Sequence, residues 1–137
     1  MRVSFDFDGT LESKYIQDYA RELIERGIEV YVVTSRFGDN EKYKKFYKTS
    51  INVDVTNSDL REITNELGIP EERLIFTNMG DKYEYFEKNR DFLWHIDDDW
   101  IENDLINKNT KVRGINVFGN NTWIQQTEEI IRRELNK

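Results

Sequence analysis

The residues of this chain that could carry out chemistry are short clusters of acids, hydroxyls and one lysine. In chain order they are Asp6 and Asp8, Thr34 and Ser35, Lys82, and Asp97 and Asp98. Carboxylates that converge without positive partners repel one another, so such a group needs a cation. Mg²⁺ suits hard oxygen ligands, and the chain has no Cys and a single His. A lysine and a hydroxyl nearby would bind phosphoryl oxygens, so the clusters predict a phosphoryl-transfer site.

The first acidic pair lies at the end of a predicted strand. Residues 3–8, VSFDFD, alternate between apolar and polar side chains, which is the periodicity of a strand. Gly9 and Thr10 then favour a turn. This strand would deliver the carboxylates of Asp6 and Asp8 together.

Strand and helix periods alternate along the rest of the chain. Helices are predicted over 14–26, 40–48, 60–67, 81–89, 100–107 and from Thr122, and strands over 29–33, 73–77, 92–96 and 112–118, with a strand or extended loop over 51–55. At Thr122 a T-x-x-Q pattern fits a capping box. We therefore expect an α/β, three-layer, Rossmann-like parallel sheet with helices on both faces. The ligand site of such a sheet lies beyond the carboxyl ends of its strands, where the polar clusters fall.

The stretch Asp6-Phe7-Asp8-Gly9-Thr10 resembles the D-x-D-G-T signature of phosphatases in the haloacid dehalogenase superfamily. Three further motifs of that family follow in the right order. The run from Val30 to Thr34 is similar to its second motif, Asp81-Lys82 to its lysine motif, and Ile96-Asp97-Asp98 to its acidic motif. The resemblance covers residues 3 to about 105.

This resemblance implies a role for each motif residue. Asp6 would be the nucleophile that forms an aspartyl-phosphate, and Asp8 the general acid and base. Thr34 and Lys82 would hold the phosphoryl oxygens. Mg²⁺ would be held by the Asp6 carboxylate, the Asp8 backbone carbonyl and Asp97. The expected activity is Mg²⁺-dependent hydrolysis of a phosphomonoester.

The acidic run leaves two candidates for the direct metal ligand, Asp97 and Asp98. Asp97 is favoured because it directly follows the apolar strand, with Asp98 holding a metal-bound water or bracing Lys82. Asp99 is expected to cap the next helix. The lone His95 is interpreted as a core residue rather than a catalytic base.

Several residues next to the motifs are further candidates for contact with the substrate or its phosphate: Gly9, Thr10, Ser35 and Arg36. The basic and aromatic residues of 41–48 could stack on single-stranded nucleic acid, but their apolar spacing favours a helix face that packs on the core. The tryptophans Trp94, Trp100 and Trp123 are interpreted as packing residues.

The spacing between motifs leaves no room for the cap domain that many members of the family carry. About five residues separate Asp8 from the first predicted helix, and four separate Thr77 from Lys82. An open site would admit a phosphorylated small molecule or a nucleic-acid end. The basic stretch of 36–48 slightly favours a nucleotide or nucleic-acid phosphate as the substrate.

Composition and net charge limit the domain number, location and partners that the chain could have. The 137 residues predict one domain over 1–137, and the net charge of −7 disfavours general attraction to nucleic acid or a membrane. No apolar run approaches the roughly 18 residues of a membrane span. The chain has no Cys, which agrees with a reducing compartment, so a cytoplasmic protein is expected. One Ala and one Pro, with many Asn, Ile and Lys, suggest an AT-rich genome such as that of a phage.

Two other functions compete with hydrolysis. One is a non-catalytic module of the same fold, which binds without turnover. The other is a receiver-like phospho-acceptor domain, which also combines Mg²⁺, Asp, Thr or Ser, and Lys. A receiver has its acidic pair on the first strand and its acceptor near the middle strand. Here D-x-D-G-T comes first and the paired acids come last, which argues against a receiver.

Overall fold

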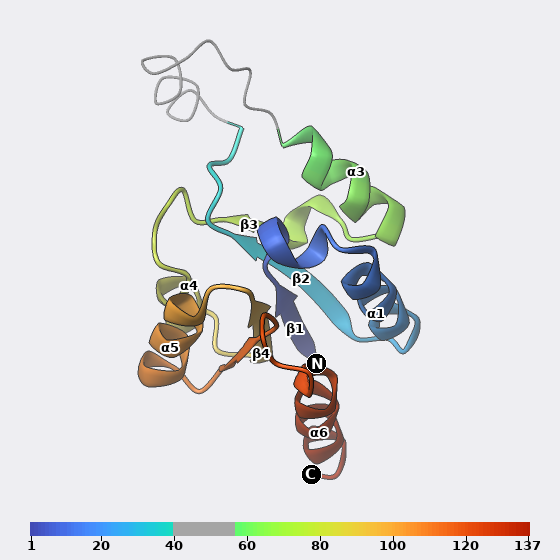
Figure 1. Ribbon diagram of the computed structural model, residues 1–137, viewed down its shortest axis with the longest axis vertical. Helices are drawn as coiled ribbons and strands as arrows, with labels where there is room; N and C mark the ends of the chain where they lie inside the picture. The colour runs from blue at the N-terminus through green and yellow to red at the C-terminus, as the bar shows by residue number, and fades with distance from the viewer. Residues whose placement is uncertain (40–56) are drawn as a thin grey trace.

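The computed structural model describes residues 1–39 and 57–137 of the chain (Figure 1). The predicted helix over 40–48, the predicted strand or loop over 51–55, and the basic and aromatic stretch of 41–48 lie outside the described residues.

The described part of the chain is built on one parallel sheet. Five strands lie in the order β3-β2-β1-β4-β5, and every neighbouring pair is parallel. The strands are β1 (Arg2–Phe5), β2 (Glu29–Thr34), β3 (Leu74–Phe76), β4 (Phe92–Asp97) and β5 (Arg113–Asn116). This architecture confirms the predicted α/β, Rossmann-like fold. The order reverses at β1, whose neighbours are β2 and β4, so the switch point of the sheet lies between β1 and β4.

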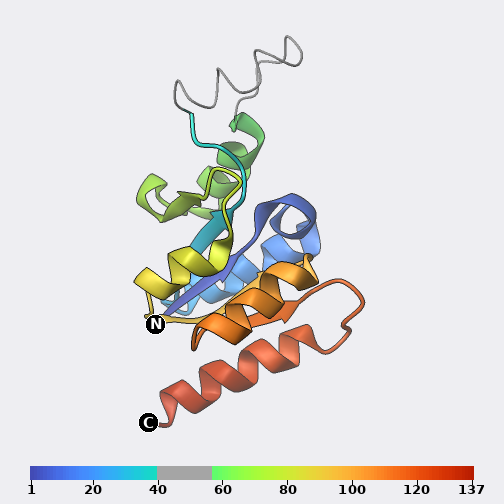
Figure 2. The same cartoon turned by 90° about the vertical axis from the view of Figure 1, so that its left-hand side faces the viewer.

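Helices cover both faces of the sheet, which makes three layers (Figures 1 and 2). The helical segments are η1 (Phe7–Leu11), α1 (Lys14–Glu25), α3 (Ser58–Leu67), η2 (Glu71–Arg73), α4 (Lys82–Lys88), α5 (Trp100–Asn109) and α6 (Trp123–Leu135). The apolar residues of α1, α3 and α6 share one core cluster with the sheet, and those of α4 and α5 belong to a second cluster. The helices α1, α3 and α6 therefore bury an apolar face against the sheet, whereas α5 buries only Asn103 and Ile106.

Aromatic residues join the two sides of this core to the central strands. Phe5 of β1 packs edge-on against Trp94 of β4, with ring centroids 5.5 Å apart. On the opposite face Phe86 of α4 packs edge-on against Phe92 of β4 at 5.2 Å. These contacts fix β1 and β4, the two strands that end at the predicted site.

Three local predictions were wrong. β1 ends at Phe5, and the chain turns sharply through Asp8 (φ −65°, ψ 124°) and Gly9 (φ 76°), so strand alternation does not continue to Asp8. Thr122 forms no side-chain cap at the start of α6; its Oγ1 accepts a hydrogen bond from the Gln126 side chain instead. Trp100 is 65% exposed rather than packed.

The outer edge of β5 is closed by side chains of the chain itself. The Asn107 side chain accepts a hydrogen bond from Gly114 N at 2.9 Å and donates one to Gly114 O at 3.0 Å. The Asn120 side chain donates to the carbonyl of Asn116 at 2.9 Å. Gly114 is required here because a Cβ would lie 2.7 Å from the backbone oxygen of Asn103 in α5.

Within residues 1–39 and 57–137, no helix combines the length and the apolar character that a membrane span requires.

Candidate active site

The pairing of β1 with β4 brings Asp6 and Asp97 to the same edge of the sheet. Phe5 is in register with Ile96, and Asp6 N donates to Ile96 O at 2.8 Å. Asp97 is the last residue of β4, so the two carboxylates lie side by side where the strands end. Both are buried, with 4% and 1% of their surface exposed. Such burial of two acids requires compensating charge.

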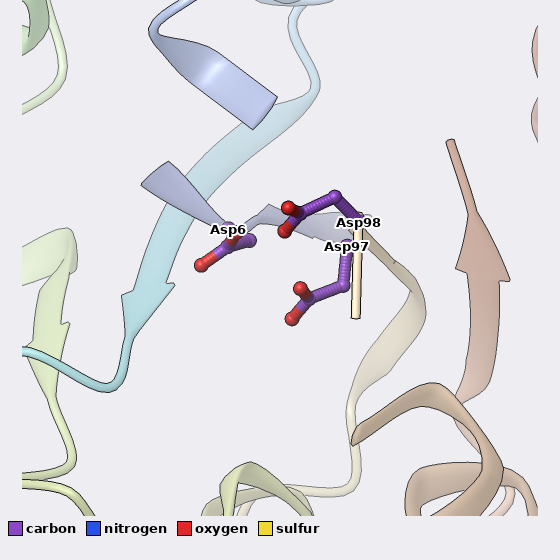
Figure 3. Close-up of side chains that lie close together, drawn as sticks. All are labelled: Asp6, Asp97 and Asp98. Atoms are coloured by element: carbon purple, nitrogen blue, oxygen red, sulfur yellow. The ribbon is translucent and has the colours of Figure 1, made fainter. Parts of the chain in front are cut away.

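Asp6, Asp97 and Asp98 form an acidic trio (Figure 3). Each offers a carboxylate oxygen, and these oxygens lie within 4.8 Å of one another. Oxygen donors alone, without Cys and without a second His in the chain, are the ligand set of a hard cation. The residues present therefore fit Mg²⁺.

Lys82 is the cation that the structure places against this trio. Its Nζ lies 2.7 Å from Asp6 Oδ1 and 2.6 Å from Asp97 Oδ2, and its side chain is 3% exposed. Burial alone would lower the pKa of Lys82, but the two carboxylates raise it, so Lys82 stays charged. Lys82 begins α4, and its backbone N–H donates to Glu102 Oε2 of α5 at 3.0 Å. Glu102 thus anchors the helix end that carries the lysine.

Asp6 has the most perturbed carboxyl group of the site. Burial raises the pKa of Asp6 to about 8, although Lys82 opposes that shift. The charge of Asp97 raises this pKa further. In the absence of a metal the carboxyl of Asp6 therefore tends to keep its proton at neutral pH. A divalent cation would displace that proton.

Asp97 is held by protein donors on both of its oxygens. Oδ2 accepts from Lys82 and lies 2.8 Å from His95 Nε2, while Oδ1 accepts from Asp99 N at 3.0 Å. Burial would raise the pKa of Asp97, but His95 and Lys82 together lower it below its usual value. Lys82 is thus braced by Asp97 and Asp6; the expectation that Asp98 braces it is not met in these contacts.

His95 is fully buried between Asp97 and Ser4. Burial lowers the pKa of His95, so the ring is neutral. An ionised Asp97 can only accept, which assigns the ring proton to Nε2. Nδ1 then accepts from Ser4 Oγ at 2.9 Å. His95 is a core residue, as interpreted from the sequence, and it also orients Asp97.

Asp8 lies apart from Asp6, contrary to the expectation that one strand delivers both carboxylates together. Asp8 is exposed and belongs to an ion-pair network with Arg36 and Asp59. The Arg36 guanidinium donates two hydrogen bonds to each of these carboxylates, at 2.7 to 2.9 Å. It also lies over the Phe7 ring, 4.9 Å from the centroid. Carboxylates thus occupy the Arg36 donors that the sequence assigned to a substrate.

The remaining predicted contacts surround Asp6. Thr10 Oγ1 donates to Asp6 Oδ2 at 3.3 Å. Thr34, fully buried at the end of β2, accepts from Arg36 N through Oγ1, so its hydroxyl hydrogen is available to another acceptor. Ser35 is half-buried, and its carbonyl accepts from Met79 N at 2.7 Å. Gly9, predicted to contact the substrate or its phosphate, has its backbone amide already hydrogen-bonded: Gly9 N donates to Glu12 Oε1 at 2.7 Å.

Sequence reasoning missed the supporting roles of Asp59, His95 and Glu102. His95 stands two residues before Asp97 on one strand, so the two side chains share a face of the sheet, and this period could have linked them. Asp59 and Glu102 lie in the first turns of α3 and α5. Acids are common there for reasons of helix electrostatics, so no signal distinguishes their contacts with Arg36 and Lys82. Asp99 caps α5 as predicted, accepting from Ile101 N.

No family model and no curated protein match the sequence. Among solved structures, the chain is similar to one from Vibrio cholerae described as a "putative 3-deoxy-D-manno-octulosonate 8-phosphate phosphatase". The identity is 14% and the TM-score 0.49, over 98% of this chain and 84% of that chain. At this level the likeness adds nothing to the assignment of the site, which rests on the residues above.

Proposed function

We propose that the protein is a Mg²⁺-dependent phosphomonoester hydrolase that works through an aspartyl-phosphate on Asp6. The observation that carries the proposal is the position of Lys82 between Asp6 and Asp97, beside the third carboxylate of the trio. A carboxylate can approach a phosphate dianion only where positive charge neutralises both. The sequence motifs and this constellation support the same chemistry.

The carboxylates of the acidic trio would not all bind the metal directly. Both oxygens of Asp97 already accept from protein donors, whereas Asp98 is exposed and has its carboxylate turned towards Asp6 (Figure 3). We therefore favour Asp6 and Asp98 as direct carboxylate ligands, with Asp97 positioning Lys82 and the backbone carbonyl of Asp8 as a further ligand. Bound Mg²⁺ supplies positive charge that lowers the repulsion between Asp6 and the phosphate.

In the first step a carboxylate oxygen of Asp6 attacks phosphorus, and the bond from phosphorus to the ester oxygen breaks. The leaving oxygen takes a proton from the Asp8 carboxyl. Lys82 and the Thr34 hydroxyl donate hydrogen bonds to the phosphoryl oxygens. In the second step water attacks phosphorus, Asp8 accepts the proton of that water, and the bond to Asp6 breaks with release of inorganic phosphate.

Asp8 can serve as acid and base while one of its oxygens stays hydrogen-bonded to Arg36 and the other exchanges its proton with the leaving group or water. The pair is half-exposed, and exposed ion pairs are weak enough to exchange. We propose that Arg36 orients Asp8 rather than binding the phosphate. We further propose that the substrate is a phosphorylated small molecule or a nucleic-acid end and that the protein acts in the cytoplasm.

The test measures inorganic phosphate released from an aryl phosphate, nucleoside monophosphates and a 3′-phosphorylated oligonucleotide, with Mg²⁺ or with EDTA. Wild-type protein should release phosphate only with Mg²⁺, and Asp6→Asn should lose release while keeping its circular dichroism spectrum. Asp104→Asn, which removes a half-exposed acid of α5 that pairs with Lys108, is the matched control and should retain full activity. Mg²⁺ binding by the wild type without turnover of any substrate would favour a non-catalytic module.

A further inference from the structure

The end of the molecule opposite the acidic trio carries a groove that the proposed reaction does not use. It lies between the first residues of β4 and β5 and the last turns of α6, and its volume is about 340 Å³. Phe92 begins β4 and Asp97 ends it, so the rise of about 3.3 Å from each residue of this strand to the next separates the groove from the trio by about 16 Å. We call this feature the basic groove.

Cations line the basic groove. Lys111 and Arg113 approach from the side of β5, and Arg133 and Lys137 from the side of α6. A single acid, Glu134, lines it. The lining side chains therefore carry a net charge of +3 in a chain whose net charge is −7. This local excess is opposite to the charge of the whole molecule, so it focuses anions at one place.

Two of these cations have no acidic partner within the described part of the chain. Lys111 and Arg113 form no ion pair there, whereas Lys137 pairs with Glu134 at 2.9 Å and Arg133 with Glu129 at 3.1 Å. Both unpaired side chains are exposed and free to turn towards a ligand.

Apolar side chains complete the wall of the groove. Phe92 and Leu93 contribute from β4, and Ile130 contributes from α6. Pockets that bind small organic ligands combine such an apolar wall with a few charged groups, and their volumes range from about 300 to 1,000 Å³. The basic groove stands at the lower end of this range.

We infer that the basic groove binds a small organic anion in which a phosphate or carboxylate is joined to an apolar body, of about the size of a mononucleotide. The cations would bind the acidic group and the apolar wall would cover the body. A nucleic-acid strand is disfavoured because its backbone would extend past the groove, over a molecule whose net charge is −7. This site is separate from the proposed hydrolytic centre.

AMP, adenosine and inorganic phosphate are suitable probes, in EDTA so that no metal draws phosphate to the acidic trio. Titrations followed by ¹H–¹⁵N NMR should show saturable shifts from AMP at the amides of Phe92, Leu93, Lys111 to Arg113 and the last turn of α6. The amides of Asp6 to Thr10 should not shift. Adenosine and inorganic phosphate should each bind at least tenfold more weakly than AMP.

The variant K111Q/R113Q removes the two unpaired cations and should raise the Kd for AMP at least tenfold. Arg132→Gln is the matched control, because Arg132 is an exposed cation of α6 outside the groove; its Kd should stay within twofold of wild type. An unchanged Kd in K111Q/R113Q, or no saturable shift at the groove, would overturn the inference. Tighter binding of an unphosphorylated single-stranded oligonucleotide than of AMP would replace it with a nucleic-acid surface.

Discussion

Arg36 binds Asp8 side-on, with Nε 2.9 Å from Oδ2 and Nη2 2.7 Å from Oδ1. These two hydrogen bonds use guanidinium donors that could otherwise bind a phosphate, and they fix the orientation of Asp8, the proposed general acid. Arg36 could bind the substrate or orient Asp8, and these two roles predict different kinetic effects. A residue that binds the substrate mainly changes KM, and a residue that orients Asp8 mainly changes kcat.

Arg36→Lys keeps the charge but loses the planar fork. Because Asp8 would no longer be held in one orientation, we expect kcat to fall by about 10-fold to 100-fold, with KM changed less than threefold. Steady-state kinetics on the best substrate of the panel measure both constants. The same substitution at Arg21, a half-buried arginine of α1, is the control. A large rise in KM at constant kcat would return Arg36 to the phosphate-binding role predicted from the sequence.

Asp59→Asn should lower stability in a pH-dependent way. The hydrogen bonds from Arg36 lower the pKa of Asp59 to about 2, below the value of about 3.9 in an unfolded chain. The stabilisation is therefore complete above pH 4 and is lost as the pH falls towards 2. Because Asp59 is more than half exposed, the loss in the variant should be below about 1 kcal/mol at pH 6. Urea unfolding at pH 6 and pH 3 measures the difference, which should shrink at the lower pH; a constant difference would contradict this linkage.

Metal affinity should rise with pH. Because burial raises the pKa of Asp6 to about 8, its carboxyl is largely protonated below that pH, and Mg²⁺ must displace the proton. We expect the affinity to increase up to about tenfold per pH unit below pH 8 and to level off above it. Calorimetry in two buffers of different ionisation enthalpy should detect release of about one proton at pH 6.5 and none at pH 9. Equal proton release at both values would show that Asp6 is already ionised.

His95→Gln should impair both stability and metal binding. The variant leaves the Ser4 hydroxyl and Asp97 short of a buried partner, which costs about 1–3 kcal/mol. Because His95 orients Asp97, which positions Lys82 beside the proposed ligand Asp6, the affinity for Mg²⁺ should fall, by less than the about 10-fold to 100-fold expected when a group that orients a direct ligand is lost. Ile96→Val, a buried truncation on the same strand, is the control: it should cost about 0.5–1.5 kcal/mol without weakening Mg²⁺. If both variants lower the affinity for Mg²⁺ equally, the cause is a general loss of packing around β4 rather than the loss of the His95–Asp97 contact.

Gly9→Ala should disrupt the trio by collision. A Cβ at Gly9 would lie 2.3 Å from Asp98 Oδ2, and the residue has φ +76°. Gly119 has φ +68° and nothing within 4 Å of its would-be Cβ, so Gly119→Ala carries the backbone strain without the collision. Each variant should lose about 1 kcal/mol of stability from that strain. Only Gly9→Ala should weaken Mg²⁺ by at least tenfold, as measured by calorimetry.

The sequence predicts the sheet well because buried parallel strands and amphipathic helices have distinct periods. The apolar run of 29–33 and the helix stopped by Gly68 both appear in the structure within a residue or two of the expected bounds. The predicted end of β1 was wrong because the apolar and polar residues continue to alternate past Phe5 in the sequence. In the structure the chain turns at Gly9, whose lack of a Cβ leaves room for the Asp98 carboxylate. That contact joins residues 9 and 98, and no local pattern records it.

The sequence predicted which residues meet at the candidate site better than it predicted which of these residues contact each other. Asp6, Lys82 and Asp97 come together because the ends of β1 and β4 and the start of α4 meet at one edge of the sheet. The partner of Asp8, however, depends on where the turn after Asp6 points its side chain. Which acid braces Lys82 depends on side-chain directions at the end of β4. These are three-dimensional relationships that spacing along the chain does not determine.

The side-chain amides on β5 have a consequence for self-association. A parallel sheet exposes hydrogen-bonding groups on its last strand, and such groups recruit strands from other molecules into aggregates. On β5 both polar groups of Gly114 and the carbonyl of Asn116 are already satisfied by Asn107 and Asn120. A foreign strand would have to displace these amides before it could hydrogen-bond there, so the chain protects this border of its sheet against fibre-like growth.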